Sequence, residues 1–128
     1  MKTIILDTNF LLVPGQVSLD IFEEIQRIMD EPYELAVLQG TLTELTTLST
    51  TGKQIDQRAA RLALQLIKHK ALKIIPGSEA GYVDDLLVEK AQQNVVVATM
   101  DAALRRRILA KGSAIIGVRQ KTHLYLRR

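Results

Sequence analysis

Acidic residues occur at four positions of this sequence where an apolar stretch ends and a loop or a helix begins. They are Asp7 in IILDTN, Glu44 in TLTEL, the pair Asp84 and Asp85 in VDDLL, and Asp101 in VVVATMD. Carboxylates gathered without cationic partners repel one another, so a fold that assembles them needs a positively charged occupant. Mg²⁺ and Mn²⁺ prefer oxygen ligands and also bind substrate phosphate. The pattern therefore predicts metal-assisted hydrolysis of phosphodiesters.

The elements that position these acids alternate between strands and helices. Apolar runs predict strands over residues 2–6, 35–38, 72–75, 95–99 and 114–118, with a short edge strand at 124–126. Helices are expected after Ser18 as N-cap, from Thr41, after Gly52, near Asp84 and over residues 101–110. The unbroken apolar run at 95–99 implies a strand buried on both faces. Alternation of this kind predicts one α/β domain, residues 1–128, with a parallel sheet covered by helices on both faces.

Such a sheet would bring the distant acids together. In parallel sheets, ligands bind beyond the carboxyl ends of the strands, near a switch in strand order. Asp7 follows the first expected strand and Asp101 follows the fourth, while Glu44 and Asp84 begin the helices after the second and third. All four positions therefore fall on the same edge of the predicted sheet.

Each acid also has an ordinary structural explanation. Asp7 begins Asp-Thr-Asn, which is good turn chemistry. Glu44 completes the capping-box pattern that Thr41 begins. Asp84 and Asp101 could each cap a helix. None of these explanations accounts for the shared edge, so the functional interpretation is favoured for the set.

Composition excludes several classes of protein. The 128 residues suit one domain, and 47% hydrophobic with 24% charged residues is typical of a globular protein. The absence of cysteine excludes disulfides, thiolate zinc sites and a cysteine nucleophile, and is compatible with the expected cytoplasmic location. His69 and His123 lack ligand spacing. No apolar run approaches a membrane span, and Asp7 interrupts the N-terminal apolar stretch, which favours a strand over a signal peptide.

The charge is unevenly distributed. The net charge is +3, yet the chain from Arg105 onward holds eight lysines and arginines and no acid. A basic region beside an acidic site suits a polyanionic partner, although a solvated surface is the simpler alternative for a charge run. Tyr125 is the sole aromatic residue of this region, so a base-stacking platform is not expected.

Competing catalytic motifs are absent. The chain contains no GxxxxGK[ST] loop, no GxGxxG and no GxSxG elbow. A phosphatase of the haloacid-dehalogenase type would require a second aspartate where Asn9 stands. A receiver domain would require paired acids after the first strand and an aspartate after the third, where Pro76-Gly77 stands instead.

The same motifs resemble those of PIN-domain ribonucleases over essentially the full chain. The resemblance rests on LDTNFLL, TLTEL, VDDLLVEKA and VVVATMDAALRRRI, in that order. The block from VDDLL to RRRI is especially similar to the branch that processes small-subunit ribosomal RNA, including its archaeal relatives. The VapC-type toxins share the acids but usually carry a different context around them.

The resemblance implies a three-layer α/β/α sandwich with a central parallel sheet of about five strands. It also implies an endoribonuclease, a hydrolase that cuts single-stranded RNA with one or two Mg²⁺ or Mn²⁺ ions. Asp7, Glu44, Asp84 and Asp101 would be the catalytic ligands, with Asp85 as a further metal ligand.

The resemblance extends to supporting residues and partners. Asn9 and Thr99 would orient a ligand or water, with turn and strand-end hydrogen bonding as an equal alternative. At least one of Arg105, Arg106 and Arg107 would face the RNA backbone, but helical spacing prevents all three from doing so. An rRNA-processing enzyme, a VapC-type toxin, a non-catalytic RNA-binding or ribosome-assembly factor and a small-molecule phosphatase stay open. So do a homodimer, an antitoxin and a ribosome-assembly partner; no membrane partner is expected.

Overall fold

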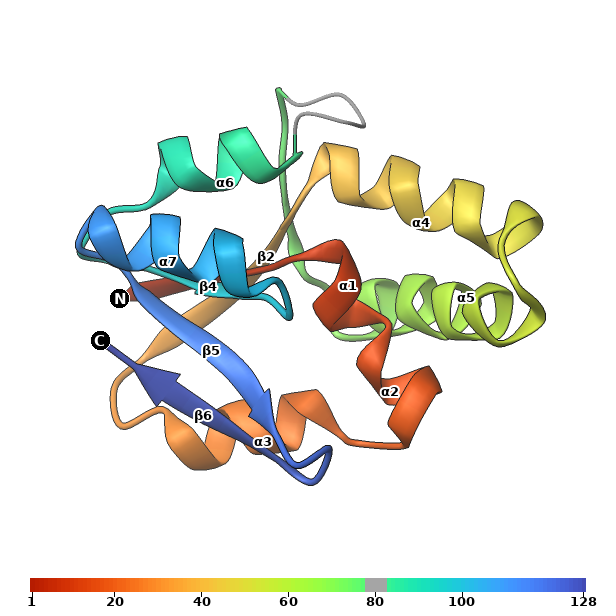
Figure 1. Ribbon diagram of the computed structural model, residues 1–128, viewed down its shortest axis with the longest axis horizontal. Helices are drawn as coiled ribbons and strands as arrows, with labels where there is room; N and C mark the ends of the chain where they lie inside the picture. The colour runs from red at the N-terminus through yellow and green to blue at the C-terminus, as the bar shows by residue number, and fades with distance from the viewer. Residues whose placement is uncertain (78–82) are drawn as a thin grey trace.

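The computed structural model of the protein describes residues 1–77 and 83–128 and has a three-layer α/β architecture (Figure 1). Within these residues a six-stranded sheet has the order β3-β2-β1-β4-β5-β6. The strands are β1 (Lys2–Leu6), β2 (Tyr33–Leu38), β3 (Lys73–Ile75), β4 (Val95–Ala98), β5 (Ala114–Arg119) and β6 (His123–Arg127). Strands β1 to β5 pair in parallel, and β6 adds an antiparallel edge. The predicted central parallel sheet is confirmed, and the expected edge strand is its sixth member.

The helices divide between the two faces of the sheet. They are α1 (Thr8–Leu11), α2 (Val13–Val17), α3 (Ile21–Ile28), α4 (Gln39–Thr51), α5 (Gln54–His69), α6 (Val83–Lys90) and α7 (Ala102–Ala110). Residues of α1 to α5 share one core with the sheet, and residues of α6 and α7 share the other. No helix in the described part of the chain is both long and apolar enough to cross a membrane.

The pleat of the central strands feeds both cores. Ile4 and Leu6 of β1 point into the first core, and Ile5 between them points into the second. All four residues of β4 are buried, as the unbroken apolar run predicted. The two central strands are therefore fixed from both sides, and the loops at their carboxyl ends inherit that rigidity.

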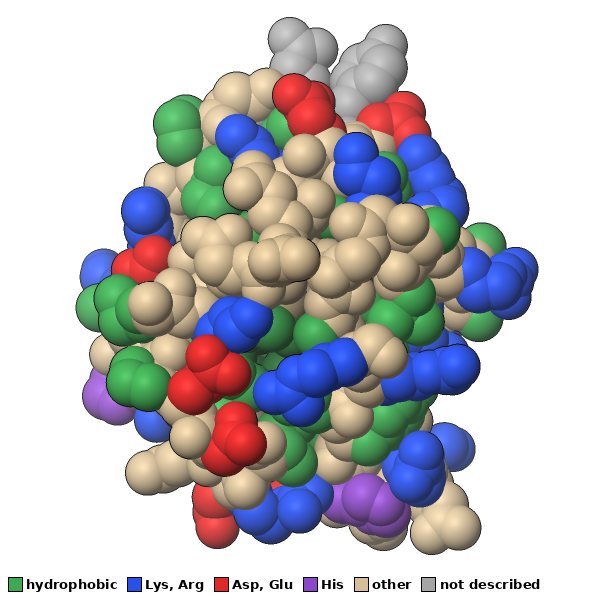
Figure 2. Space-filling model, turned by 90° about the vertical axis from the view of Figure 1, so that its left-hand side faces the viewer, with side chains coloured by type: hydrophobic (Ala, Val, Ile, Leu, Met, Phe, Trp, Pro, Cys, Tyr) green, Lys and Arg blue, Asp and Glu red, His purple; other side chains and the backbone are tan. Residues whose placement is uncertain are grey.

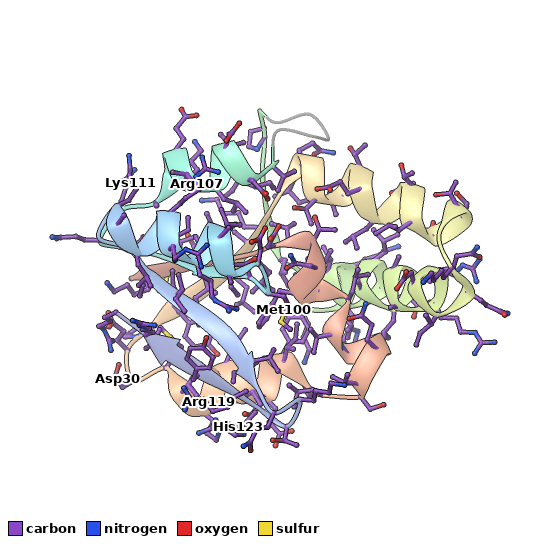
Figure 3. All side chains as sticks on the ribbon, in the orientation of Figure 1. Asp30, Met100, Arg107, Lys111, Arg119 and His123 are labelled. Atoms are coloured by element: carbon purple, nitrogen blue, oxygen red, sulfur yellow. The ribbon has the colours of Figure 1, made fainter. Side chains whose placement is uncertain are left out.

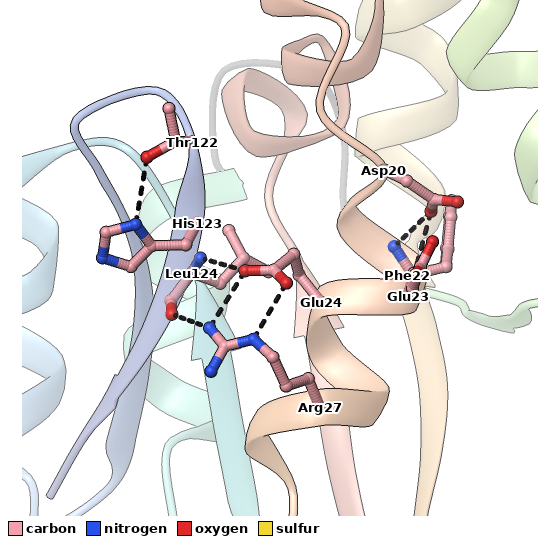
Figure 4. Close-up of polar contacts among 8 residues, drawn as sticks. All are labelled: Asp20, Phe22, Glu23, Glu24, Arg27, Thr122, His123 and Leu124. Carbon is pink, nitrogen blue, oxygen red and sulfur yellow. Dashed lines mark hydrogen bonds and ion pairs between the residues drawn. The ribbon is translucent and has the colours of Figure 1, made fainter.

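The third helix begins later than expected. Ser18 has a left-handed backbone (φ 56°) and ends α2, so its prediction as an N-cap is wrong. Asp20 is the cap instead, because its Oδ1 accepts the backbone N–H groups of Phe22 and Glu23, each at 3.1 Å (Figure 4). Ser18 and Asp20 are both residue types that cap helices, but only Asp20 accepts two backbone N–H groups of α3.

Helices α4 and α5 correct two further expectations. Helix α4 begins at Gln39, so Glu44 lies in its interior and the predicted capping box with Thr41 is wrong. The apolar spacing of α5 predicts a buried stripe that begins at Ile55, but Ile55 is 54% exposed. Helix α5 approaches α2 closely at Ala59, since a Cβ atom on Gly15 would lie 2.5 Å from the Cα of Ala59. Small residues therefore build this interface.

Two side chains of α3 bind the outer edge of β6 (Figure 4). Glu24 accepts the backbone N–H of Leu124 at 2.9 Å, and Arg27 donates to its carbonyl oxygen at 3.0 Å. Arg27 and Glu24 are also paired with each other at 2.9 Å. The hydrogen bonds from Arg27 and from Leu124 lower the pKa of Glu24 from 4.5 to about 2. Helix α3 thus covers backbone groups that an edge strand otherwise leaves unpaired.

Replacing Glu24 with alanine is expected to lower the melting temperature at neutral pH, because the Leu124 N–H and the Arg27 guanidinium both lose their acceptor. The pKa of Glu24 is depressed, so its contribution is present above pH 4.5 and is lost as the pH falls toward 2. The melting difference between wild type and Glu24→Ala should therefore shrink across that range. Glu23→Ala is the matched control, because Glu23 is the exposed neighbour on the same helix. Equal melting of the two variants at pH 7 would show that the contact is not stabilising.

Candidate active site

The candidate site lies where the strand order reverses. Strand β1 pairs with β2 on one side and with β4 on the other, which makes the carboxyl ends of β1 and β4 the switch point of the sheet. Asp7 follows β1 directly, and its backbone N–H donates to the carbonyl of Ala98 at 2.9 Å. Thr99 and Asp101 follow β4. Residues 92 positions apart, Asp7 and Thr99, are thereby in direct contact.

Asp7 is the most buried acid of the site, with 3% of its surface exposed. Its Oδ1 accepts the backbone N–H of Thr8 at 2.8 Å, and its Oδ2 accepts the hydroxyl of Thr99 at 2.7 Å. Burial raises the pKa of Asp7 from 3.8 to about 6; the two hydrogen bonds oppose the rise, and the charges of Asp84 and Glu44 add to it. The folded protein therefore holds a carboxylate that is costly to ionise.

Glu44 is connected to this acid through Thr8. The Thr8 hydroxyl donates to Glu44 Oε1 at 3.0 Å and lies 3.4 Å from the hydroxyl of Thr41. Because Thr8 adjoins Asp7 in the chain, one residue fixes both acids. Neither Thr8 nor Thr41 was predicted as a site residue, and Thr41 was expected only to begin a capping box. Thr8 stands inside the DTN motif, but its contact with α4 depends on how the helices pack.

The loop after β4 is held by polar side chains. Asn9 Oδ1 accepts the backbone N–H of Met100 at 3.0 Å and lies 3.3 Å from the hydroxyl oxygen of Thr99. Thr99 Oγ1 also accepts the backbone N–H of Asp101 at 3.1 Å. Turn and strand-end hydrogen bonding, the alternative considered for Asn9 and Thr99, is therefore present. Thr99 additionally contacts a candidate ligand, Asp7.

Asp101 caps helix α7. Its Oδ1 accepts the backbone N–H groups of Ala103 at 2.9 Å and Leu104 at 3.2 Å. The capping role considered for this residue is thus confirmed. The same cap fixes the carboxyl group at the carboxyl edge of the sheet, beside the loop that contacts Asp7.

Asp84 and Asp85 have different surroundings. Both lie in the first turn of α6, and neither is shown to be its N-cap. Asp84 interacts electrostatically with Asp7 and with Asp101; burial, then the Asp101 charge, raises its pKa, while Arg107 opposes the rise. Asp85 is paired with Arg107 at 3.0 Å, and its side chain is 73% exposed. Asp84 is therefore the member of the pair that interacts with the other acids.

The three arginines of α7 diverge. Arg105 is half-buried and donates to the carbonyl oxygen of Thr99 at 3.2 Å, beside the candidate site. Arg107 contacts α6 through Asp85 (Figure 3). Arg106 is exposed and has no ion-pair partner in the described parts of the chain. The three side chains therefore have different surroundings, and which of them faces RNA stays a prediction.

The donors present suit a hard divalent cation. Asp7, Glu44, Asp84 and Asp101 offer only anionic oxygens, the ligands that Mg²⁺ and Mn²⁺ prefer. Within residues 1–77 and 83–128, none of the four has a lysine, arginine or histidine within ion-pair distance. In those ranges, no three aspartate, glutamate or histidine side chains lie close enough together to bind one metal ion in this conformation. The four carboxylates therefore fit a divalent cation by their ligand chemistry and their charge, and Asp7 fits best because it is buried.

Comparison with known proteins supports one family. Residues 4–121 match the family described as PIN like domain. The chain is 28% identical over 125 residues to Ribonuclease VapC4 of Methanocaldococcus jannaschii, covering 96% of this chain and 95% of that protein. The solved PIN domain endonuclease Utp24 superposes with a TM-score of 0.79 at 25% identity, covering 98% of this chain and 91% of that one. A domain of a functionally unknown protein from M. jannaschii shares the fold, with a TM-score of 0.61 at 16% identity over 93% and 92% of the two chains.

Proposed function

The chain belongs to the PIN-like domain family, and from that membership we propose that it is a metal-dependent endoribonuclease that hydrolyses phosphodiester bonds of single-stranded RNA. The observation that carries the proposal is Asp7, a buried acid without an ion-pair partner in the described residues, electrostatically coupled to Glu44 and Asp84. The names of the similar proteins, a ribonuclease and an endonuclease, support RNA cleavage. A pure RNA-binding protein would gain nothing from negative charge that faces phosphate, which argues against a non-catalytic role.

In the proposed mechanism, Asp7, Glu44, Asp84 and Asp101 would hold one or two Mg²⁺ or Mn²⁺ ions. A bound ion supplies positive charge that acidifies water and offsets the charge of the phosphate. The chain's own residues prepare the ligands. Thr8 and Thr99 each donate one hydrogen bond to Asp7 and so fix its plane, and each Asp7 oxygen keeps a free lone pair. Thr8 fixes Glu44 in the same way.

RNA would approach over α7. Arg105 lies against the Thr99 carbonyl next to the acids, where it could contact a phosphate near the cleaved bond. Arg106 is exposed on the next position of the helix. Arg107 is engaged by Asp85, so we propose that Asp85 supports the site through this arginine, alongside any direct contribution as a ligand.

The biological substrate divides the proposal into two candidates. The VDDLL-to-RRRI block resembles the branch that processes small-subunit ribosomal RNA, and it favours that role, with a ribosome-assembly partner. The similarity to Ribonuclease VapC4 favours a toxin ribonuclease with an antitoxin partner. Cleavage of a small-subunit rRNA precursor at one position would support the first candidate, and cleavage of unrelated cellular RNA would support the second.

The purified protein is expected to cut single-stranded RNA internally in Mg²⁺ or Mn²⁺ and to lose that activity in EDTA. Hydrolysis should return when the ion is added back, because the carboxylates of the site persist without it. The measurement uses end-labelled single-stranded and hairpin RNAs on denaturing gels, with internal fragments distinguishing endonuclease from exonuclease action. Full activity in EDTA would refute metal dependence. Absence of cleavage with both ions would refute the nuclease assignment.

A further inference from the structure

Strands β5 and β6 form a two-stranded ribbon whose outward face carries a row of basic and aromatic side chains. His123, Tyr125 and Arg127 alternate onto the same face of β6. On β5, Gly117 is paired with Tyr125, and Arg119 is paired with His123. These side chains and Lys121 at the hairpin turn together form the ribbon face.

Tyr125 lies flat across the neighbouring strand. A Cβ atom on Gly117 would be 2.6 Å from the Tyr125 hydroxyl oxygen and 2.7 Å from the ring carbon that bears it. Glycine is therefore the residue that leaves room for the ring at this position. Tyr125 is half-buried, because its ring covers Gly117 of β5 and also packs against the second core, on the side of the sheet that α6 and α7 cover.

Arg119 is stacked on that ring. Its guanidinium carbon lies 4.6 Å from the Tyr125 ring centroid, and the residue is exposed. Among the described residues it forms no ion pair. A guanidinium is planar, so one face covers the tyrosine and the other is available to a second flat group. Tyr125 thus orients a plane that Arg119 presents.

The chain segment that forms this plane is basic, and the acids Asp30 and Glu31 lie at its far end, paired with Arg128. No aspartate or glutamate follows Asp101 in the chain, while Lys121 and Arg127 add charge at the two ends of β6. Glu24, an acid at the β6 edge, is engaged by Arg27 and Leu124. On the flank shown in Figure 2, lysine and arginine side chains run down the right-hand side. Figure 3 shows Arg119 and His123 on the hairpin below Lys111 of the α7 end.

The ribbon face reaches the same edge of the sheet as the candidate site. Strand β5 runs parallel to β4, and the Thr99 N–H donates to the Ile116 carbonyl at 3.2 Å. Arg119 lies three residues beyond Ile116, roughly 10 Å further in the direction of the carboxyl edge. The turn that follows is tight, with left-handed backbones at Gln120 (φ 57°) and Lys121 (φ 60°). The Thr122 N–H donates to the Arg119 carbonyl at 3.2 Å, which makes this the type I′ turn that ordinarily joins two antiparallel strands.

We propose that the ribbon face binds the RNA strand next to the cleavage site by stacking an unpaired base on the outer plane of Arg119, while Lys121 and Arg127 contact phosphates. The inference rests on RNA being the substrate, as proposed above. Arginine planes stack on unpaired bases whatever their sequence, which fits single-stranded RNA. A stacking platform was not predicted from the sequence, because Tyr125 is the sole aromatic residue of the basic region and the contact between Arg119 and its ring depends on the pairing of β5 with β6.

The test is binding of a short single-stranded RNA that contains the fluorescent base 2-aminopurine, whose emission falls on stacking. Binding is measured in the Asp7→Asn chain, so that cleavage does not interfere. Arg119→Lys keeps the charge and removes the plane; it should weaken binding roughly 5- to 10-fold and abolish the quenching. Arg119→Gln should in addition flatten the log–log salt slope by about 0.7. Arg58→Gln, the same change on exposed α5, should alter neither quantity.

Further variants keep the proposal falsifiable. Gly117→Ala displaces the Tyr125 ring and should reproduce the loss of quenching without any change of charge. Circular dichroism checks that this variant folds. If Gly117→Ala does not fold, the result for Arg119→Lys alone tests the proposal. Unchanged affinity and quenching in Arg119→Lys would overturn the proposal. So would duplex RNA binding as tightly as single-stranded RNA, or polyglutamate displacing the RNA as well as an equal charge of RNA does. Because cleavage is assayed separately with wild type, a failure of the nuclease assignment and a failure of the ribbon face give different results.

Discussion

The Asp7→Asn variant is expected to cleave RNA more than about 100-fold more slowly than wild type at saturating Mg²⁺. Removing a residue that only supports a metal ligand costs about 10- to 100-fold in activity, and loss of a ligand should cost at least as much. Asparagine keeps the shape of the side chain and can still accept the Thr8 N–H. It removes the negative charge that would attract the cation at the switch point of the sheet. Single-turnover cleavage of an end-labelled RNA measures the chemical step directly.

The matched control for this loss is Asp20→Asn. Asp20 is also an aspartate at a helix N-terminus, but it caps α3, away from the acidic edge. Its cleavage rate should stay close to that of wild type. A wild-type rate in Asp7→Asn, or an equal loss in both variants, would show that Asp7 is not the central ligand.

The same substitution is expected to stabilise the metal-free protein at neutral pH. The pKa of Asp7 is raised from 3.8 to about 6, so the folded state holds the proton more tightly than the unfolded chain does. Below pH 3.8 both states are protonated and the group costs nothing. Stability is lost as the pH rises from 3.8 to 6, and the loss is complete above that window. At about 1.4 kcal/mol for each pKa unit, ionised Asp7 costs on the order of 2–3 kcal/mol.

Chemical denaturation in EDTA at pH 7.5 and pH 4 measures this effect. At pH 7.5 Asp7→Asn should have the higher free energy of unfolding, and the difference from wild type should largely disappear at pH 4. Adding Mg²⁺ should stabilise wild type more than the variant, because the ion compensates the charge that the variant lacks. A variant less stable than wild type at pH 7.5 would show that the hydrogen bonds of the carboxylate outweigh its burial.

The strands could be predicted because their signal is local. Strand β1 has the predicted bounds, Lys2–Leu6, and the apolar run of β4 reported its burial on both faces. The short helices α1 and α2 were not predicted. Gly15 and Pro14 weaken any helical pattern there, and the segment is held by packing against Ala59 instead. Tertiary contact of that kind leaves no periodic trace in the sequence.

For the candidate site, the sheet topology allowed the acids to be grouped from the sequence, but the side-chain contacts between them could not be predicted. Consecutive parallel strands place the residues that follow them on one edge, which is why Asp7 and Asp101 could be grouped from sequence. The Thr8–Glu44 hydrogen bond joins α1 to α4, and the Arg107–Asp85 pair joins α7 to α6. Such contacts depend on how helices are rotated. The capping-box prediction was wrong for a related reason. Thr41 and Glu44 have the spacing of a capping box, but α4 begins before them, at Gln39, and both residues lie inside the helix.

The hydroxyl of Thr99 carries one hydrogen for two acceptors. While Asp7 is ionised, that hydrogen points to Asp7 at 2.7 Å, and Asn9 at 3.3 Å goes without it. When Asp7 takes up a proton, the carboxyl group can donate to Thr99 instead, which releases the threonine hydrogen toward Asn9. Asn9 in turn accepts the N–H of Met100. Thr99 is thus a two-position relay, and the backbone amide of Met100 is an indirect reporter of whether the buried acid is charged.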